Sequence, residues 1–314
     1  MEKQIEDRIF KIAFKKLKSS VYYDKTQLIL RNDIVRYEQN SKDKIDSKLE
    51  SLCTQFNDDS KFEKLKELIK RSISISAFPK KLIKSQTPGV IINKQTSQTT
   101  VNQNQYFIDM CVEGHILGVV WLMNIGSKLD KLVYEKSYGN RIRKKLINEL
   151  SDEPTFSPYL FEPYFMQYES WRDTALDEAK KYLHQKNDVM ILTMDLKRYF
   201  YSVDVTQNAF DKMLEDAGID KSDKAKCGLV KLNELMYEIV NTYAKQFGED
   251  FERRNILPIG FLPSNVISNW CLRNLDKAII DGWNPVFYGR YVDDILIVDK
   301  IEPGSKIFNL IRSE

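Results

Sequence analysis

Residues 287–298 read FYGRYVDDILIV, in which the adjacent acids Asp293 and Asp294 separate two apolar, strand-like runs. This pattern predicts a β-hairpin with two carboxylates at its turn. Two like charges beside apolar strands lower stability, and proteins tolerate them where a divalent cation neutralises the pair. Mg²⁺ prefers such hard oxygen ligands, so the pair indicates metal-dependent phosphoryl chemistry. The alternative is a polar turn without chemistry, because Asp is a favoured turn residue.

A third acid follows another apolar run. Residues 189–194 (VMILTM) predict a buried strand that ends at Asp195. If this strand lies beside the hairpin, Asp195, Asp293 and Asp294 meet at one end of an antiparallel sheet. With the carbonyl of Leu196 they would hold two Mg²⁺ ions, or Mn²⁺ as a substitute, about 3.5–4 Å apart, a spacing that suits in-line displacement at phosphorus. The alternative for Asp195 is a strand-end carboxylate that caps a neighbouring amide.

The remaining pattern predicts an α+β fold in which helices pack on one face of an antiparallel sheet. Residues 1–105 are mainly helical and highly charged, and they include a mobile polar loop at 84–105. An amphipathic helix over 172–184 leads into the strand that ends at Asp195. Further helices are expected after Thr206, over about 222–247, and from Ser264, which suits an N-cap position.

Composition excludes several classes of protein. The 314 residues have a net charge of +3, 42% hydrophobic residues and a mean hydropathy of −0.44, as in an ordinary globular protein. No run approaches the ~18 apolar residues of a membrane span, so no membrane partner is expected. His115 and His184 are the only histidines, which disfavours a His-dependent hydrolase. Four separated cysteines without a CxxC spacing indicate neither zinc nor disulfides, and favour the reducing cytoplasm.

Three ordered segments resemble the palm motifs of reverse transcriptases. Residues 195–200 (DLKRYF) are similar to the first motif, an Asp followed by an aromatic pair. The spacing Gly260-x-x-x-Ser264-x-x-x-x-Asn269 is similar to the second motif, and YVDD at 291–294 to the third. Residues 137–141 (SYGNR) resemble the fingers motif that precedes the palm. The resemblance covers about residues 106–298.

This resemblance implies a right-hand polymerase with fingers at 106–187 and a palm at 188–314. Only twenty residues follow Asp294, so the thumb is expected to be absent or incomplete and the chain to be a fragment of a longer protein. The three carboxylates become the catalytic metal ligands. Phe200 takes the place of the bulky residue that blocks a 2′-hydroxyl and favours deoxynucleotides; a buried core Phe is the alternative there. The nucleotide-binding residues implied are Leu196, Phe200, Arg141 (for the triphosphate, or else a surface arginine), Gly260, Ser264 and Asn269.

One difference from the second palm motif indicates a subgroup of reverse transcriptases. Most retroviral and group II intron enzymes carry Gln before the glycine of the second palm motif, whereas this chain has Ile259. An apolar residue there is typical of bacterial defence-associated and abortive-infection reverse transcriptases. The segment 115–143 is also most similar to that group, near the type 3 defence-associated systems. Some relatives copy a noncoding RNA, and others add nucleotides without a template and prime from a protein tyrosine.

The expected function is therefore RNA-directed DNA synthesis in anti-phage defence, in the bacterial cytoplasm. Its partners would be deoxynucleoside triphosphates, an RNA template or noncoding RNA, the DNA product, and a protein partner or a second copy of the chain. An RNA-dependent RNA polymerase shares the palm and metals, but Phe200 argues against it. A non-catalytic nucleic-acid-binding scaffold is the third reading, and the three intact carboxylates argue against it.

Overall fold

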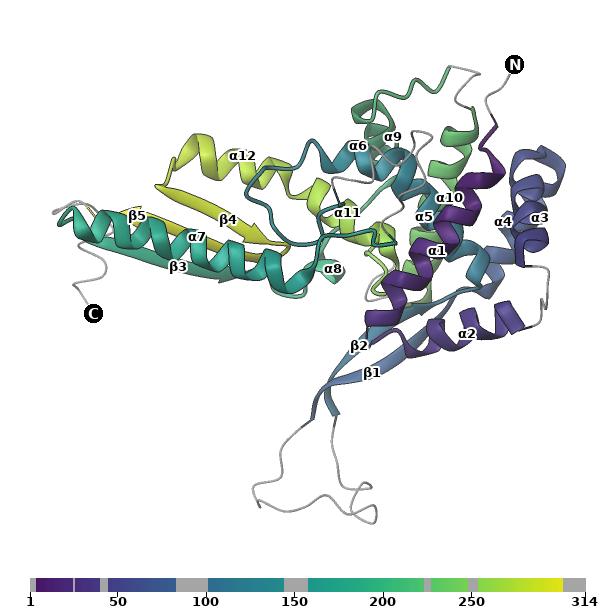
Figure 1. Cartoon of the computed structure of the whole chain (residues 1–314), viewed down its shortest axis with the longest axis horizontal. Coiled ribbons are helices and arrows are strands. Elements are labelled where there is room, and N and C mark those ends of the chain that lie inside the picture. Colours follow the sequence, from purple (N-terminus) through teal and green to yellow (C-terminus); the bar gives the residue numbers. More distant parts are fainter. Residues whose placement is uncertain are drawn as a thin grey trace, which may run out of the picture.

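The structure is a computed structural model that describes residues 4–24, 26–39, 45–82, 101–143, 158–222, 227–247 and 254–301. Its helices and strands form a mixed fold with two small antiparallel sheets. Figure 1 shows a helical body from which the three-stranded sheet extends, and the hairpin of β1 and β2 projects from that body. No helix in the described part is long and apolar enough to cross a membrane.

The helical body is built from helices throughout the chain. It contains α1 (Asp7–Tyr23), α2 (Leu28–Gln39), α3 (Ile45–Asn57), α4 (Asp59–Ser72), α5 (Val112–Trp121), α6 (Ser127–Asp130), α8 (Tyr199–Ser202), α9 (Gln207–Asp216), α10 (Cys227–Ala244) and α11 (Leu262–Cys271). α5 is apolar around its whole circumference, and every residue except Glu113 is buried. A helix of this kind forms the centre of a core. The π-helical turn η2 (Leu122–Gly126) and the 3₁₀ turn η5 (Lys245–Phe247) extend α5 and α10.

The second sheet carries the predicted hairpin. β4 (Phe287–Tyr291) and β5 (Asp294–Lys300) form it, and β3 (Val189–Asp195) pairs with the other edge of β5. The order β3-β5-β4, antiparallel throughout, confirms that the Asp195 strand neighbours the hairpin.

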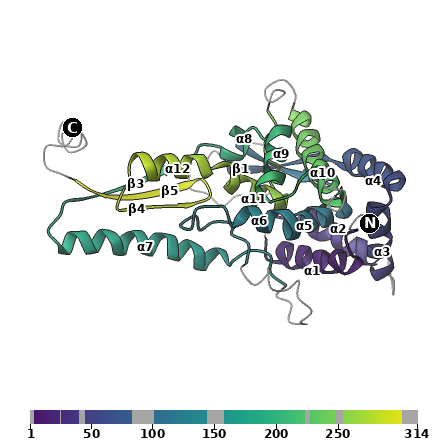
Figure 2. The ribbon, with the colours of Figure 1, turned by 90° about the horizontal axis from the view of Figure 1, so that it is seen from above.

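Helices cover both faces of this sheet, not one face as the sequence pattern predicted. α7 (Tyr164–His184) lies on one face and α12 (Arg273–Gly282) on the other, as Figure 2 shows. Alternation along the strands explains this, because successive side chains point to opposite faces and both sets are apolar. The face against α7 buries Phe287, Leu296, Val298, Trp171, Ala175 and Ala179. The face against α12 joins Tyr288, Ile295 and Ile297 to Leu275, Ile279 and Ile280.

Two further expectations from sequence were wrong. β3 is an edge strand rather than a buried one, and Ile191 and Met194 are 47% and 38% exposed. Ser264 lies inside α11 and not at its N-cap, which is Phe261, because Pro263 in the first turn lets the helix begin earlier.

The other sheet joins the N-terminal region to the helical body. β1 (Ser74–Leu82) and β2 (Val101–Asp109) pair antiparallel. The Ile108 amide donates a hydrogen bond of 2.9 Å to the Ile259 carbonyl, so β2 anchors the loop before Gly260. The predicted loop at 84–105 lies outside the described residues as far as residue 100, and 101–105 belong to β2.

Candidate active site

The hairpin turn between β4 and β5 has an unusual backbone. Tyr291 pairs with Asp294, which leaves Val292 and Asp293 as its two central residues. Val292 has φ of 58°, as the first central residue of a type II′ turn requires. A β-branched residue rarely adopts this conformation, so the surroundings must hold it there. The Val292 side chain is buried beside Tyr199 and Leu272, which opposes relaxation of the turn.

The three predicted acids lie at one end of the sheet. Asp195 is directly opposite Asp294 in the antiparallel register. The Leu196 amide donates a hydrogen bond of 3.1 Å to the Asp293 carbonyl, which ties the end of β3 to the turn. Facing residues in such a ladder have Cα atoms about 4.5–5.5 Å apart. The backbone therefore places Asp195, Asp293 and Asp294 at one end of the sheet, where the sequence predicted that they would meet.

The electrostatics of this end are unfavourable for ionised carboxylates. Burial, together with the charges of Asp294 and Asp195, raises the pKa of Asp293. Burial and the charge of Asp195 likewise raise the pKa of Asp294. Carboxylate oxygens that repel one another are the donor set that a hard divalent cation would stabilise. Within the described residues, no three His, Cys, Asp or Glu side chains are arranged to hold a metal ion, so binding would require these side chains to rotate.

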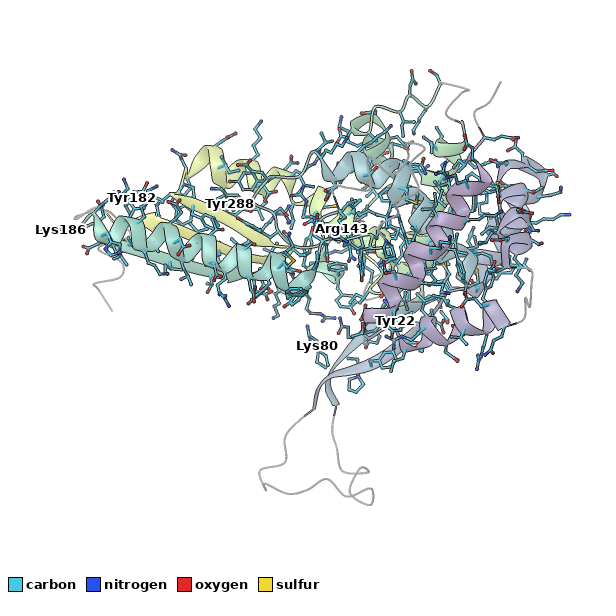
Figure 3. The ribbon with its side chains drawn as sticks, in the orientation of Figure 1. Tyr22, Lys80, Arg143, Tyr182, Lys186 and Tyr288 are labelled. Carbon is cyan, nitrogen blue, oxygen red and sulfur yellow. The ribbon has the colours of Figure 1, made fainter. Side chains whose placement is uncertain are left out.

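A positively charged side chain, that of Lys80, also acts on this end of the sheet. The charge of Lys80, on β1, lowers the pKa of Asp293 against the larger effects that raise it. Lys80 is labelled in Figure 3, where it projects from the strand pair below the helical body. The sequence did not predict it, because nothing local connects β1 with the hairpin. An exposed lysine facing the acidic turn is suited to a phosphate.

A cavity of about 340 Å³ opens beside the turn. It is lined by Asp24, Thr26, Gln27, Gln105, Phe107, Phe200, Ile259, Gly260, Phe261, Leu262, Asn265 and Asp293. Two predicted nucleotide-binding residues, Phe200 and Gly260, therefore share a cavity with the predicted metal ligand Asp293. Phe200 is also packed against the core, so the functional and structural readings of this residue are compatible.

Gly260 is required by its backbone and by its neighbours. Its φ is +90°, a conformation that residues with a side chain rarely adopt. A Cβ there would lie 2.8 Å from Nε2 of Gln27 and 3.2 Å from a ring carbon of Phe107. The glycine thus lets the N-terminal region approach the cavity closely.

The structure places the other predicted binding residues away from this cavity. Ser264 is fully buried, and its hydroxyl has no hydrogen-bond partner among the described residues. Asn269 is fully buried, and its Nδ2 donates to the Gly139 carbonyl at 2.8 Å. The Arg141 guanidinium binds Asp130 (Nε–Oδ1 2.9 Å) and the carbonyls of Asp130, Tyr134 and Ser137, so it fixes the 130–141 loop. These contacts give Arg141 and Asn269 a structural role, and the nucleotide-binding roles implied for them stay predictions.

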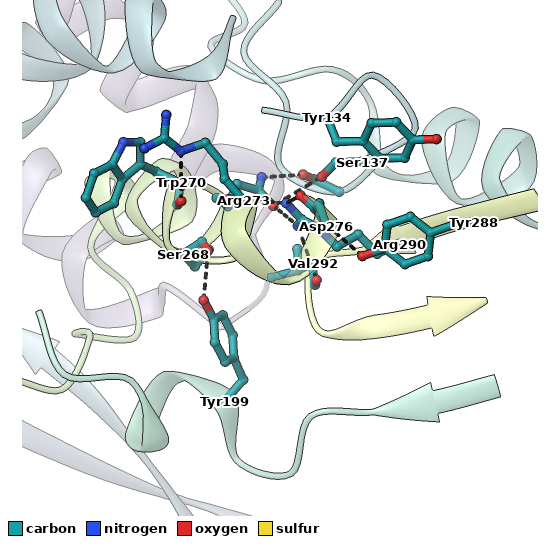
Figure 4. Close-up of polar contacts among 12 residues, drawn as sticks. Tyr134, Ser137, Tyr199, Ser268, Trp270, Arg273, Asp276, Tyr288, Arg290 and Val292 are labelled. Carbon is teal, nitrogen blue, oxygen red and sulfur yellow. Dashed lines mark hydrogen bonds and ion pairs between the residues drawn. The ribbon is translucent and has the colours of Figure 1, made fainter. Parts of the chain in front are cut away.

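A buried ionic network holds the hairpin turn between β4 and β5, and Figure 4 shows it. Arg290 is fully buried and binds Asp276 through two bonds, Nε–Oδ1 at 2.7 Å and Nη2–Oδ2 at 2.9 Å. Its Nη1 donates to Oδ1 of Asn269 at 2.6 Å and to the Val292 carbonyl at 3.3 Å. The Tyr288 hydroxyl donates to Asp276 at 2.6 Å. Arg290 therefore holds the strained residue of the turn directly.

The sequence did not predict this network. The one sign of this network in the sequence is Arg290, which stands within an apolar strand. A buried arginine needs a partner. Asp276, the partner, lies on a helix that looks amphipathic and charged, and nothing local marks it as buried.

The segment before Arg141 extends the sheet along β4. The Tyr138 amide donates to the Arg290 carbonyl at 2.8 Å, and the Arg290 amide donates to the Lys136 carbonyl at 3.1 Å. Ser137 and Arg290 form a parallel bridge. The predicted fingers motif is thus bonded to the strand that leads into the turn.

Gly139→Ala tests how tightly this segment packs on the turn. The new Cβ would lie 2.7 Å from Cγ2 and 2.8 Å from the amide nitrogen of Val292, so the hairpin would have to move. We expect the free energy of unfolding in urea to fall by about 1–3 kcal/mol. Gly282→Ala is the control, because nothing lies within 4 Å of its Cβ position. Equal stability of the two variants would contradict the close packing.

Comparison with known proteins agrees with this geometry. A comparison with curated proteins found no match. The family model described as "Reverse transcriptase (RNA-dependent DNA polymerase)" matches residues 137–305, more than half of the 314-residue chain. The matched region contains the segment beside β4, all three acids, the loop at Gly260 and the network around Arg290. The chain therefore belongs to the reverse transcriptase (RNA-dependent DNA polymerase) family.

Proposed function

We propose that the chain is an RNA-directed DNA polymerase that adds deoxynucleotides at the end of the sheet where Asp195 faces Asp294. The register pair Asp195–Asp294 carries this proposal, because it unites acids that are far apart in sequence. Asp195, Asp293 and Asp294, with the Leu196 carbonyl, are assigned to Mg²⁺, for which Mn²⁺ can substitute. When bound, such ions activate a 3′-hydroxyl and neutralise triphosphate charge.

The other roles in the reaction are assigned to residues of the cavity and of the turn. The cavity beside Asp293 receives the nucleotide, with Phe200 against the sugar and Gly260 leaving room for it. Lys80, whose charge lowers the pKa of Asp293, is assigned to the triphosphate. Arg290 and Asn269 keep the turn in the conformation that presents the acids. The division into an N-terminal region at 1–105, fingers at 106–187 and a palm at 188–314 is part of the same proposal.

Phe200→Ala tests the choice of sugar. Removing the ring opens the cavity where a 2′-hydroxyl would otherwise collide. We expect the ratio of ribonucleotide to deoxynucleotide kcat/KM to rise roughly 10- to 100-fold. Phe261→Leu is a control, because Phe261 lines the same cavity but does not follow Asp195 in the chain. An unchanged ratio in the Phe200 variant, or a wild-type preference for ribonucleotides, would contradict the deoxynucleotide assignment.

Product analysis tests the activity itself. The purified protein is incubated with Mg²⁺ and each labelled dNTP or NTP, with and without RNA, and the product is treated with DNase, RNase or protease. DNase-sensitive product supports the proposal. Dependence on RNA would indicate copying of a template or noncoding RNA, whereas protease sensitivity would indicate priming from the protein. Nucleic-acid binding without incorporation would favour a non-catalytic scaffold.

The proposed function includes a role in bacterial antiviral defence. It is supported by Ile259 before Gly260 and by the similarity of 115–143 to defence-associated enzymes. Expression in a bacterial host should lower phage plaque counts, and the Asp293→Asn/Asp294→Asn form should not. Equal plaque counts with both forms, over a panel of phages, would contradict the defence role.

A further inference from the structure

Gln27 is a buried polar residue that the fold does not use. It lies in the connection between α1 and α2, and it is 8% exposed. Its backbone is bonded, since the amide donates to Asp24 and the carbonyl accepts from Arg31. No hydrogen bond joins its side-chain amide to another described residue. The side chain instead lines the cavity beside the hairpin turn, where a bound molecule can reach the amide.

The Gln27 amide lies at the cavity beside the catalytic turn. Its Nε2 and Oε1 are 2.8 and 3.4 Å from the position of a Cβ built on Gly260. The cavity that Gln27 lines also contains Phe200 and Asp293. Tyr22, labelled in Figure 3, marks the end of α1 from which this connection starts, close to the β1–β2 pair. A segment before the family match thus lines the same cavity as Asp293 of the turn.

The lining around Gln27 suits a neutral, planar group. Three aromatic rings, from Phe107, Phe200 and Phe261, border the cavity, and no Lys, Arg or His is among its described lining residues. Phosphate is better matched by cationic donors. A nucleobase offers flat apolar faces and an edge with donors and acceptors, which aromatic rings and amides recognise together. A volume of about 340 Å³ suits one nucleoside rather than a base pair.

We propose that the side-chain amide of Gln27 hydrogen-bonds the edge of the base of the incoming nucleotide and sets which base binds best when no template strand is present. The proposal rests on the proposed function, since it assumes that the cavity receives a nucleotide. The amide supplies one donating and one accepting group, so it distinguishes bases by the order of groups on their edges. Base selection then comes partly from residues that precede the matched family region.

The test measures binding separately from catalysis. Dissociation constants of the four labelled dNTPs are determined by equilibrium dialysis for the wild type, Gln27→Leu and Gln27→Glu, with Mg²⁺ present and no primer or RNA. Loss of one hydrogen bond in Gln27→Leu should weaken the tightest-bound dNTP roughly threefold to tenfold and bring the four constants closer together. Gln27→Glu replaces the donor by a second acceptor, so it should change the order of the four.

Two controls separate this role from a structural one. Gln39→Leu, at the exposed end of the adjoining helix α2, should leave all four constants unchanged. Because the Gln27 amide bonds no described residue, Gln27→Leu should not lower the melting temperature, whereas loss of a structural hydrogen bond would. Wild-type constants in both Gln27 variants would overturn the inference. Absence of incorporation by a wild-type protein that still binds dNTPs would instead overturn the proposed function.

Discussion

Asp293→Asn/Asp294→Asn is expected to abolish nucleotide incorporation while raising the melting temperature of the metal-free protein. Activity is lost because asparagine cannot supply the anionic oxygens that hold a divalent cation. Stability rises because burial and mutual repulsion penalise the ionised acids, as their raised pKa values indicate. Activity and stability should therefore change in opposite directions.

The pH dependence follows from the sign of the pKa shift. Folding raises the pKa of these carboxyls above the unfolded value of about 3.9. The folded protein is therefore more stable at a pH where they are protonated than at a pH where they are ionised. That contribution is complete below pH ~4 and is lost as the pH rises through the raised pKa of the folded protein. Wild type and double variant should thus melt at similar temperatures near pH 4, and the variant should melt higher at pH 7.

Calorimetry with EDTA and with added Mg²⁺ checks this expectation beside the incorporation assay. Mg²⁺ should raise the melting temperature of the wild type and leave that of the double variant unchanged. Asp281→Asn, an exposed acid on α12, should retain full activity and show no altered metal response. Persistent incorporation by the double variant would remove these acids from the catalytic assignment.

Arg290→Met is expected to give the largest loss of stability among single substitutions in the site. It leaves the Asp276 carboxylate buried without its ionic partner, and breaking a buried pair in this way costs about 3–5 kcal/mol. Domains typically have only about 5–15 kcal/mol in total. Urea unfolding of the purified variant measures the loss.

Two matched variants test the interpretation. Tyr288→Phe removes one hydrogen bond to Asp276 and keeps the ion pair, so it should cost only about 1 kcal/mol. Arg290→Met/Asp276→Leu removes both charges and should be more stable than Arg290→Met alone. If Arg290→Met cost no more than Tyr288→Phe, the ion pair could not be the element that holds the turn.

Local patterns predicted the hairpin and the strand before Asp195, because apolar runs flanked by turn residues are short-range signals. They also predicted a helix over 172–184, which in the structure begins earlier, at Tyr164. The helix expected from Ser264 is divided at Leu272 into α11 and α12.

The unpredicted features all depend on contacts between distant segments. The Arg290–Asp276 pair, the approach of Lys80 to Asp293 and the position of Gln27 against Gly260 each join elements with no common local signal. For Arg141 and Asn269, the resemblance implied nucleotide binding, and the structure adds tertiary contacts in which their donors fix loops. Sequence thus located the acids and two residues of the cavity, Phe200 and Gly260, but not the segments that close around them.

The bonds between the 136–138 segment and Arg290 involve only main-chain atoms. Side-chain substitution leaves such bonds in place, and only proline, which lacks an N–H, would delete one of them. A side-chain link runs beside them, because the Ser137 hydroxyl donates to Oδ1 of Asn269, which also accepts from Arg290. A nucleotide that draws the segment inward would therefore tighten the turn through the peptide backbone and through Asn269 together.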